Sequence, residues 1–244
     1  MSSERERGAH PRDERELGSA AVPVLREATA DLGWLLGRGY SEGAAAKLVG
    51  DHFQLTGRQR QAVRRCACGA DQSAGRAARR VGREALAGAT VHVDGFNVLI
   101  TLERALSGGP VLRGADGAVR DLAGVHGSWR ARAPTGAAIA AAGRYLHAAR
   151  VAEVCWWLDR PVSNSGRLAG MLRDAAVEAG WPWRVEVVAA PDPILAEAQG
   201  VVASSDGWIL DRCAAWYSLD GAVLAEAVPG MWIVDLGARS AAGR

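Results

Sequence analysis

The stretch VHVDGFNVLI, residues 91–100, decides how this chain folds. Its β-branched, apolar beginning predicts a buried strand, its apolar end predicts a helix, and Gly95 marks the turn between them. Asp94 is then the last residue of the strand, and Asn97 lies one short step beyond it. In an open α/β sheet, ligands bind in the crevice outside the carboxyl ends of the strands. The sequence therefore places chemistry around Asp94.

Strand and helix signals continue to alternate through the rest of the chain. Strands are expected to end at Asp94 and to cover residues 152–159, 183–190, 200–206 and 231–236, with helices or helical turns at 98–106, 135–150, 163–179, 193–199 and 208–217. A glycine-rich excursion, residues 108–127, interrupts the alternation. This pattern predicts an α/β fold with a mostly parallel sheet, helices on both faces and right-handed crossovers.

The front of the chain reads as helical. Apolar residues recur at helical spacing from Leu25 onward, and Ser41 and Thr56 can cap two further helices. Short helices joined by tight turns predict a small all-α bundle of helix-turn-helix type over residues 21–88. Residues 1–20 mix both charges without an apolar core, so we expect a disordered tail there and not a signal peptide.

The third expected helix of this bundle is strongly basic. Its candidate nucleic-acid patch consists of Arg58, Arg60, Arg64 and Arg65. Most charge runs of this kind are solvated helix faces, and the other interpretation is a row of phosphate contacts that positions RNA or DNA without reading its sequence. The run has one sign although the whole protein is nearly neutral, so both interpretations stay open.

Composition narrows the class of protein. The 244 residues are 49% hydrophobic, enough for a sizeable core, and 29 Lys and Arg nearly balance 27 Asp and Glu. The four cysteines form no CxxC pair and no cluster with zinc spacing, which indicates the reducing cytoplasm. No apolar run approaches the roughly 20 residues that span a bilayer, so we expect no membrane partner.

Acidic residues follow the expected strands. Asp94, Asp159 and Asp206 each stand at the carboxyl end of a strand, and Asp211 follows about one helical turn after the last of them. Each of these residues alone has an ordinary explanation, because an Asp before a helix is usually an N-cap. Their joint placement at strand ends argues that they gather at one edge of the sheet.

Gathered carboxylates need a counter-charge. Two of them about 4 Å apart repel by about 4 kcal/mol at an effective dielectric of 20, so the group must take up protons or hold a cation. Oxygen ligands favour Mg²⁺ or Mn²⁺, ions that activate water and stabilise the leaving oxygen in phosphodiester cleavage. Candidate substrate contacts beside the acids are Asn97, Arg160, Asn164, Ser165, Arg167 and Ser205.

Three segments carry a resemblance to a known superfamily. VDGFNVLI, WWLDRPVSNSG and VVASSDGWILDR resemble the acidic motifs of the PIN-like metal-dependent ribonucleases, and they are closest to the NYN-type branches. The whole chain also resembles a prokaryotic two-part family in which a helical domain of unknown function precedes a PIN-like domain of unknown function. The most specific pieces are Asp94 with Asn97, and the Ser-Ser-Asp that ends at Asp206.

The resemblance implies a three-layer α/β/α domain over residues 89–244 with strand order 3-2-1-4-5. It assigns catalysis to Asp94, Asp159 and Asp206, and metal binding to the same three residues with Asp211 as a further ligand. Many PIN-like domains also supply an acid from a helix between the first two strands, and the expected helix 135–150 has none. Asp116 or Asp121 is the candidate replacement, and without one the site is weaker, uses fewer metals or is inactive.

The sequence thus predicts a cytoplasmic, Mg²⁺- or Mn²⁺-dependent ribonuclease whose helical domain binds RNA, and it leaves DNA cleavage and homodimer formation open. The alternative is a degenerate nuclease fold kept as a nucleic-acid-binding or scaffold module. A haloacid-dehalogenase-type phosphatase would need a second Asp where Phe96 stands. A dinucleotide-binding enzyme would need a G-x-G-x-x-G loop, which the segment after Asp94 lacks. Metal-dependent turnover separates the two remaining interpretations.

Overall fold

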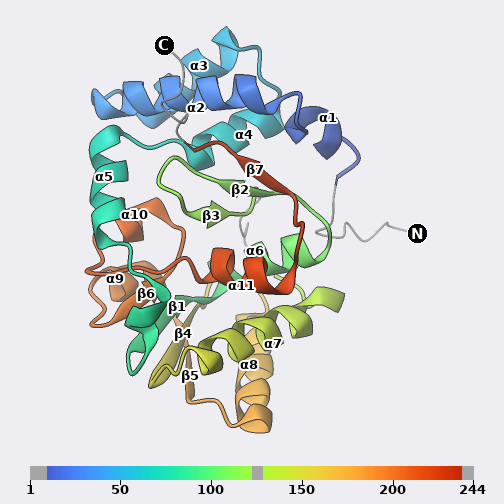
Figure 1. Ribbon diagram of the computed structural model, residues 1–244, viewed down its shortest axis with the longest axis vertical. Coiled ribbons are helices and arrows are strands. Elements are labelled where there is room, and N and C mark those ends of the chain that lie inside the picture. Colours follow the sequence, from blue (N-terminus) through green and yellow to red (C-terminus); the bar gives the residue numbers. More distant parts are fainter. Residues whose placement is uncertain (1–9, 123–128, 238–244) are drawn as a thin grey trace.

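The computed structural model describes residues 10–122 and 129–237 (Figure 1). Part of the expected tail, residues 1–9, and part of the glycine-rich excursion, residues 123–127, lie outside the described residues. Figure 1 shows helices at the top, a small sheet in the middle and a larger sheet with its own helices below. Within the described ranges, no helix is both long enough and apolar enough to cross a membrane.

The front of the chain is helical, as expected. Its elements are α1 (Asp13–Leu17), α2 (Val22–Gly37), α3 (Glu42–His52), α4 (Gly57–Cys66), α5 (Ala70–Arg79) and the 3-10 turn η1 (Arg83–Leu86). Thr56 caps α4 as predicted, because its hydroxyl accepts a hydrogen bond from the Gln59 amide and the Gln59 side chain accepts one from Thr56 N. Ser41 precedes α3 without forming a side-chain cap.

Helix α1 corrects the prediction of a disordered tail through residue 20. Leu17 is fully buried in the core of the helical region, and Asp13 and Glu16 are buried beside Arg58. Arg104, far along the chain, also donates a hydrogen bond to Asp13 at 2.8 Å. The charge pattern of residues 1–20 does not reveal this helix, because the arginines that pair with its acids lie far away in the sequence.

The larger sheet consists of four parallel strands. They are β1 (Thr90–Asp94), β4 (Glu153–Asp159), β5 (Trp183–Val188) and β6 (Val201–Ala203), in the order β5-β4-β1-β6. This is the expected order 3-2-1-4, and it places β1 between β4 and β6. The carboxyl ends of all four strands therefore meet at one edge.

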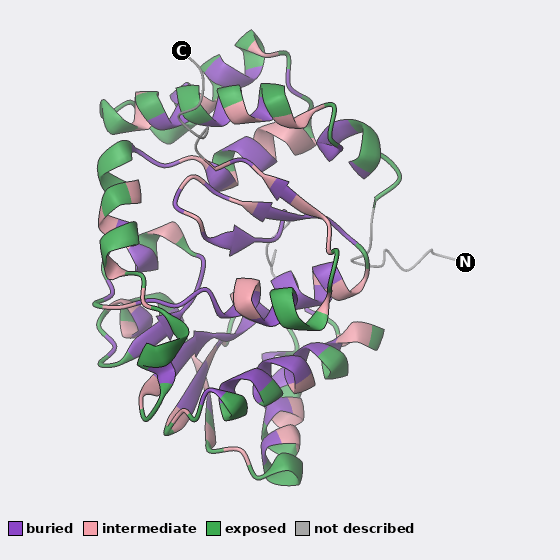
Figure 2. Cartoon of the chain, viewed as in Figure 1, coloured by how far each residue is buried: buried purple, intermediate pink, exposed green. Residues whose placement is uncertain are grey.

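Helices cover both faces of this sheet. They are α6 (Gly95–Leu106), α7 (Ala133–Ala148), α8 (Ser165–Ala179), α9 (Pro191–Ala196), α10 (Gly207–Leu210) and α11 (Leu219–Ala227). Val91 and Val93 belong to the main core with α6, α7, α8 and α11. Val202 packs in another cluster, with Leu195 of α9 and Leu210 of α10. Strands β1 and β6 and most of β4 are buried, whereas β5 at the edge of the sheet is mostly half-buried (Figure 2). Parallel strands covered by helices confirm the predicted α/β architecture.

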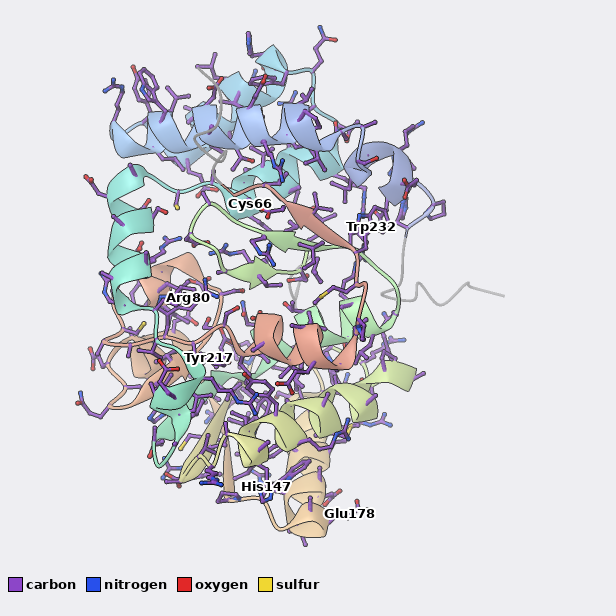
Figure 3. All side chains as sticks on the ribbon, viewed as in Figure 1. Cys66, Arg80, His147, Glu178, Tyr217 and Trp232 are labelled. Carbon is purple, nitrogen blue, oxygen red and sulfur yellow. The ribbon has the colours of Figure 1, made fainter. Side chains whose placement is uncertain are left out.

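Helix α10 is much shorter than the helix expected at residues 208–217. The chain leaves the helix because Trp216 forms isolated parallel bridges with Arg80 on one side and with Val202 of β6 on the other. Figure 3 labels Arg80 and the neighbouring Tyr217 at this junction. The connection between the helical region and the α/β domain is therefore fastened to the edge of the larger sheet.

A second sheet takes up the last strand. It contains β2 (Val111–Arg113), β3 (Val119–Arg120) and β7 (Ile233–Asp235) in the order β3-β2-β7, with β2 antiparallel to β3 and parallel to β7. The expectation that residues 231–236 form the fifth strand of the larger sheet is wrong. Strand β7 pairs instead with β2 from the glycine-rich excursion, because this position buries Val234 and Leu236 in the core of the helical region.

The helical region and the α/β domain therefore share a core. Leu112 and Leu122, from the excursion, join Val234 in the same apolar cluster as Leu25 and Leu32 of α2. The small sheet lies between the upper helices and the larger sheet in Figure 1. The boundary expected at residue 88 is a connection in the chain, and the packing continues across it.

Candidate active site

Asp94 lies at the centre of the carboxyl edge of the larger sheet. It ends β1, where its register partner on β4 is Trp157, and Asp159 ends β4 two residues later. Asp206 follows β6, the other neighbour of β1, and is exposed. The three acids predicted to share this edge are therefore carried by three adjacent strands.

The environment of Asp94 is buried and negative. Burial raises the pKa of Asp94 to about 7, although a hydrogen bond from the Ser204 hydroxyl to Oδ2, at 2.8 Å, opposes the rise. The negative charges of Asp206, Asp192 and Asp159 push this pKa further upward. The negative charges of three other carboxylates therefore all act on Asp94.

Asp192 is the acid that the sequence prediction missed. It lies at the start of α9, just after β5, and faces the same edge of the sheet. Burial and then the charge of Asp192 raise the pKa of Asp159, and burial and then the charge of Asp206 raise the pKa of Asp192. Asp159 and Asp192 line a common cavity of about 360 Å³ together with Trp208. The strand-end rule would have found Asp192 had it been applied to the strand at 183–190. We call Asp94, Asp159, Asp192 and Asp206 the acidic group.

Asn97 and two serines hold the segment that carries Asp206. The Asn97 Oδ1 atom accepts hydrogen bonds from the amide and the hydroxyl of Ser205, both at 2.9 Å. The Ser204 hydroxyl oxygen accepts one from the Asp206 amide at 3.0 Å. Ser204 thus contacts both Asp94 and the backbone of Asp206. Asn97 holds Ser205, the residue between Ser204 and Asp206.

Asp206 also caps α10. Its Oδ1 atom accepts a hydrogen bond from the Trp208 amide at 2.7 Å and a longer one from Ile209. The ordinary explanation of this Asp as an N-cap therefore holds for one carboxylate oxygen. The cap fixes the direction of the carboxylate, and so it is compatible with a second role for the other oxygen.

Asp211 does not join the acidic group. Its carboxylate accepts hydrogen bonds from Arg76 Nε at 2.7 Å and from Gln72 Nε2 at 2.9 Å, both from α5. The expected role as a further metal ligand is corrected accordingly, because the charge of Asp211 is already matched by a guanidinium. Nothing in the local sequence indicates a partner that lies so far away.

Asp116 and Asp121, the candidates for the missing helical acid, are engaged elsewhere. Burial would raise the pKa of Asp116, but Arg120 and Arg76 outweigh it and lower the pKa to about 2. Asp121 pairs with Arg65 at 3.1 Å. The charge of Asp192, from the end of β5, is among those that raise the pKa of Asp94.

The predicted phosphate contacts at the start of α8 have local roles. Asn164 adopts a left-handed backbone with φ of 68°, and its amide group donates to the Trp129 carbonyl at 2.7 Å. Ser165 is buried, and Arg160 donates to the Val187 carbonyl at 3.3 Å. Arg167 lies exposed on the same helix. Among the predicted substrate residues, Asn97 contacts the segment that carries Asp206, and Ser205 belongs to that segment.

The predicted basic patch on α4 is interleaved with acids. Arg58 pairs with Asp13, Arg60 with Asp51, Arg64 with Glu42 and Arg65 with Asp121. These acids come from α1, from α3 and from the segment after β3, so the sequence around α4 could not reveal them. Helix α4 therefore does not present the one-signed strip that its sequence indicates.

A groove runs from the acidic group toward the helical region. Its volume is about 560 Å³, and its lining includes Asn97, Asp206 and Trp208. Five arginines contribute to the lining: Arg64, Arg65, Arg76, Arg120 and Arg212. The guanidinium of Arg212 stacks on the exposed Trp208 ring at 4.1 Å from its centroid. Guanidinium groups beside an aromatic ring are suited to phosphates and bases.

The acidic group has the ligand chemistry of a hard divalent cation. Carboxylate oxygens are the ligands of Mg²⁺ and Mn²⁺, and like charges around a buried carboxylate favour a bound cation. In the described part of the chain, no three His, Cys, Asp or Glu side chains stand close enough together to hold a metal ion as they are. The donors therefore fit such an ion chemically, and binding would require the carboxylates to move toward one another.

Comparison with known proteins adds family relationships. Residues 24–79 match the family model described as "Protein of unknown function (DUF434)", and residues 83–222 match the one described as "Domain of unknown function (DUF5616)". "Uncharacterized protein MJ0935" of Methanocaldococcus jannaschii is 29% identical over 205 residues, which cover 84% of this chain and 96% of that protein. No solved structure matches. The DUF5616 model covers more than half of the chain, so the chain belongs to the DUF5616 family. The DUF434 match precedes it, which gives the chain a two-domain form with an N-terminal DUF434 region.

Proposed function

We propose that this protein is a divalent-metal-dependent ribonuclease of the PIN-like type with the acidic group as its reaction centre. The supporting observation is that three carboxylates, those of Asp159, Asp192 and Asp206, each at or just after the end of a different strand of one parallel sheet, raise the pKa of the buried Asp94 through their charges. Structural acids are usually neutralised by arginines, as Asp211 and Asp116 are here. The acidic group is instead surrounded by like charges, which is typical of sites that bind cations.

The metal supplies an activated water and charge stabilisation for the leaving oxygen of a phosphodiester. Asp94 and Asp206 would hold the ion, and Asp159 and Asp192 would supply further carboxylate ligands. Ser204 keeps Oδ2 of Asp94 at a fixed distance from the Asp206 backbone, because its hydroxyl contacts both. The two principal ligands are thereby kept in register across β1 and β6.

The RNA strand occupies the groove. Its two exposed arginines, Arg64 and Arg212, offer phosphate contacts, and Trp208 with Arg212 offers a surface for a base. This assigns nucleic-acid binding to the boundary between the helical region and the α/β domain, where Arg64 and Arg65 are the members of the predicted patch that remain involved. The described cysteines are free and buried, which suits a protein of the reducing cytoplasm.

The test is a time course of cleavage on labelled single-stranded and structured RNAs with Mn²⁺, with a DNA strand of the same sequence alongside. Asp206→Asn should abolish cleavage while preserving the fold, because Asn caps a helix as well as Asp does. Asp174→Asn is the matched control, since Asp174 is exposed on α8 away from the sheet edge, and it should leave the rate unchanged. EDTA should stop the reaction.

A second candidate function is a binding module without turnover. The observation that favours it is the absence, among the described residues, of a preformed three-ligand metal site. RNA that binds the wild-type chain in a salt-dependent way but stays intact with Mn²⁺ would support this candidate and contradict the nuclease.

A further inference from the structure

Arg76 of α5 is a buried guanidinium that reaches out of the helical region into the α/β domain. It is only 5% exposed. Its Nη1 atom donates to Asp116 Oδ2 at 2.7 Å, and its Nε and Nη2 atoms donate to the carboxylate of Asp211 at 2.7 and 3.0 Å. A guanidinium is costly to bury unless carboxylates meet it with good geometry, and two carboxylates do so here.

Asp116 joins Arg76 to a second buried arginine. The Arg120 Nη1 atom donates to Asp116 Oδ1 at 2.8 Å, and the Ala118 amide donates to the same oxygen at 3.1 Å. Both arginines and Asp116 are nearly inaccessible to solvent. One carboxylate therefore fixes two guanidinium groups that come from different parts of the chain.

The two arginines hold the backbone on either side of Asp206. Arg120 Nε donates to the Ser205 carbonyl at 2.9 Å, and Arg76 Nη2 donates to the Gly207 carbonyl at 3.2 Å. A Cβ atom on Gly207 would lie 2.7 Å from Nη2 of Arg76, so the glycine is what permits this approach. Asp206 is the residue between the two carbonyl groups that accept these hydrogen bonds.

Helix α5 also holds the far end of α10. Arg79, three residues after Arg76 and so on the same side of α5, donates to the Leu210 carbonyl at 3.3 Å and to the Asp211 carbonyl at 3.1 Å. Asp206 caps the opposite end of α10. Helix α10 is only four residues long, so its position depends on these contacts at both ends.

We propose that Arg76, together with Asp116 and Arg120, is a positioning residue for Asp206, so that the DUF434 region completes the reaction centre of the DUF5616 domain. As a statement about catalysis this rests on the proposed function, and as a statement about the Asp206 segment it stands alone. Arg76 acts through the backbone of Gly207 and through Asp211. Asp211 lies five residues after Asp206 in the sequence. Its hydrogen bonds with Gln72 and Arg76 explain why it nevertheless faces the helical region.

The first experiment is amide hydrogen exchange on the full chain without metal or RNA. Arg76→Met keeps the length and apolar stem of the side chain and removes its charge and donors. The reporters are the amides of Ser205, Asp206 and Trp208, which donate to Asn97, Ser204 and Asp206 respectively. We expect their exchange to accelerate by about tenfold or more, the effect of losing a hydrogen bond, while amides of β1 and β4 are unchanged.

Two further variants keep the test decisive. Arg83→Met is the matched control. Arg83 connects the segment between α5 and β1 to α11 of the α/β domain, but its partner is the exposed Glu226. This variant should change none of the reporter amides. Gly207→Ala should reproduce the effect of Arg76→Met by displacing the guanidinium, even if the Met variant folds poorly. Unchanged reporter amides in both variants, or acceleration spread evenly over the whole chain, would overturn the positioning role.

The functional readout is Mn²⁺ binding, measured by titration with the metal alone. Arg76→Met should weaken it about tenfold, and Arg83→Met should not. If the wild-type chain neither binds Mn²⁺ nor cleaves RNA, the proposed nuclease fails, whereas the exchange experiment still decides the positioning role. If Mn²⁺ binds equally well to the wild type and to Arg76→Met, the proposal that the helical region completes the reaction centre is refuted.

Discussion

Gly95 offers a direct test of how tightly the candidate active site is packed. It begins α6, directly after Asp94, and a Cβ atom there would lie 2.5 Å from Leu158 Cδ2 and 3.0 Å from the Trp157 carbonyl oxygen. Overlaps of this size in a packed core cost about 1–3 kcal/mol, because neighbours must leave their rotamers or the backbone must shift. Gly95→Ala should therefore destabilise the protein, although Ala is the better helix former by about 1 kcal/mol.

Equilibrium unfolding in urea, run as a double-mutant cycle with Leu158→Ala, measures this overlap. Leu158 is fully buried, so truncating it alone should cost about 2–5 kcal/mol. It also removes the nearest clashing atom, and the double variant should therefore be more stable than the sum of the single effects by about 1–2 kcal/mol. Gly170→Ala on α8, where a Cβ meets nothing within 4 Å, is the control and should be neutral or stabilising. Strict additivity, or a neutral Gly95→Ala, would refute the packing argument.

Three other predictions concern buried charges. Burial raises the pKa of Asp220 to about 6, above its unfolded value of about 4. The stability that depends on its neutral form is complete below about pH 4 and is lost as pH rises through 6. The free energy of unfolding should thus fall by up to about 3 kcal/mol by pH 8, and Asp220→Asn should flatten that part of the profile. Asp94→Asn should abolish Mn²⁺-dependent cleavage and yet raise the melting temperature of the metal-free protein, because it removes a buried charge from among like charges; a lower melting temperature would contradict the repulsion. Asp13→Ala should cost about 3–5 kcal/mol in urea unfolding by leaving Arg58 and Arg104 without their buried partner, and a loss below about 1 kcal/mol would mean that α1 is dispensable.

The sequence predicts the larger sheet well because its signal is local. The β-branched run that ends at Asp94 is a strand for reasons contained in five residues, and parallel order follows from the alternation with helices. Asp94 and Asn97 could be assigned to one site because a strand end and the first turn of the next helix are necessarily close. The rule that ligands bind at the carboxyl ends of parallel strands likewise places Asp206, which follows β6, at this edge of the sheet.

Contacts between distant segments account for what the sequence did not predict. Asp211 resembles a metal ligand until Arg76 is seen to hold it across 135 positions of sequence. Strand β7 has the composition of any buried strand, and only the apolar surface of the helical region decides that it pairs with β2. Asp192 differs from these two, because a strand-end rule applied evenly would have found it.

The position of β7 has a consequence for how the chain is made. Synthesis delivers the helical front first, but Val234 and Leu236, from the far end of the described chain, belong to the same apolar cluster as Leu25 and Leu32. The front therefore leaves the ribosome with part of its apolar surface uncovered, and it keeps that surface until nearly all of the α/β domain has been translated. Segments in this condition are prone to aggregate or to bind chaperones. Insertion of β7 is then the step that closes the molecule, and a nascent chain stalled before residue 233 should be markedly more sensitive to protease in its helical front than the finished protein.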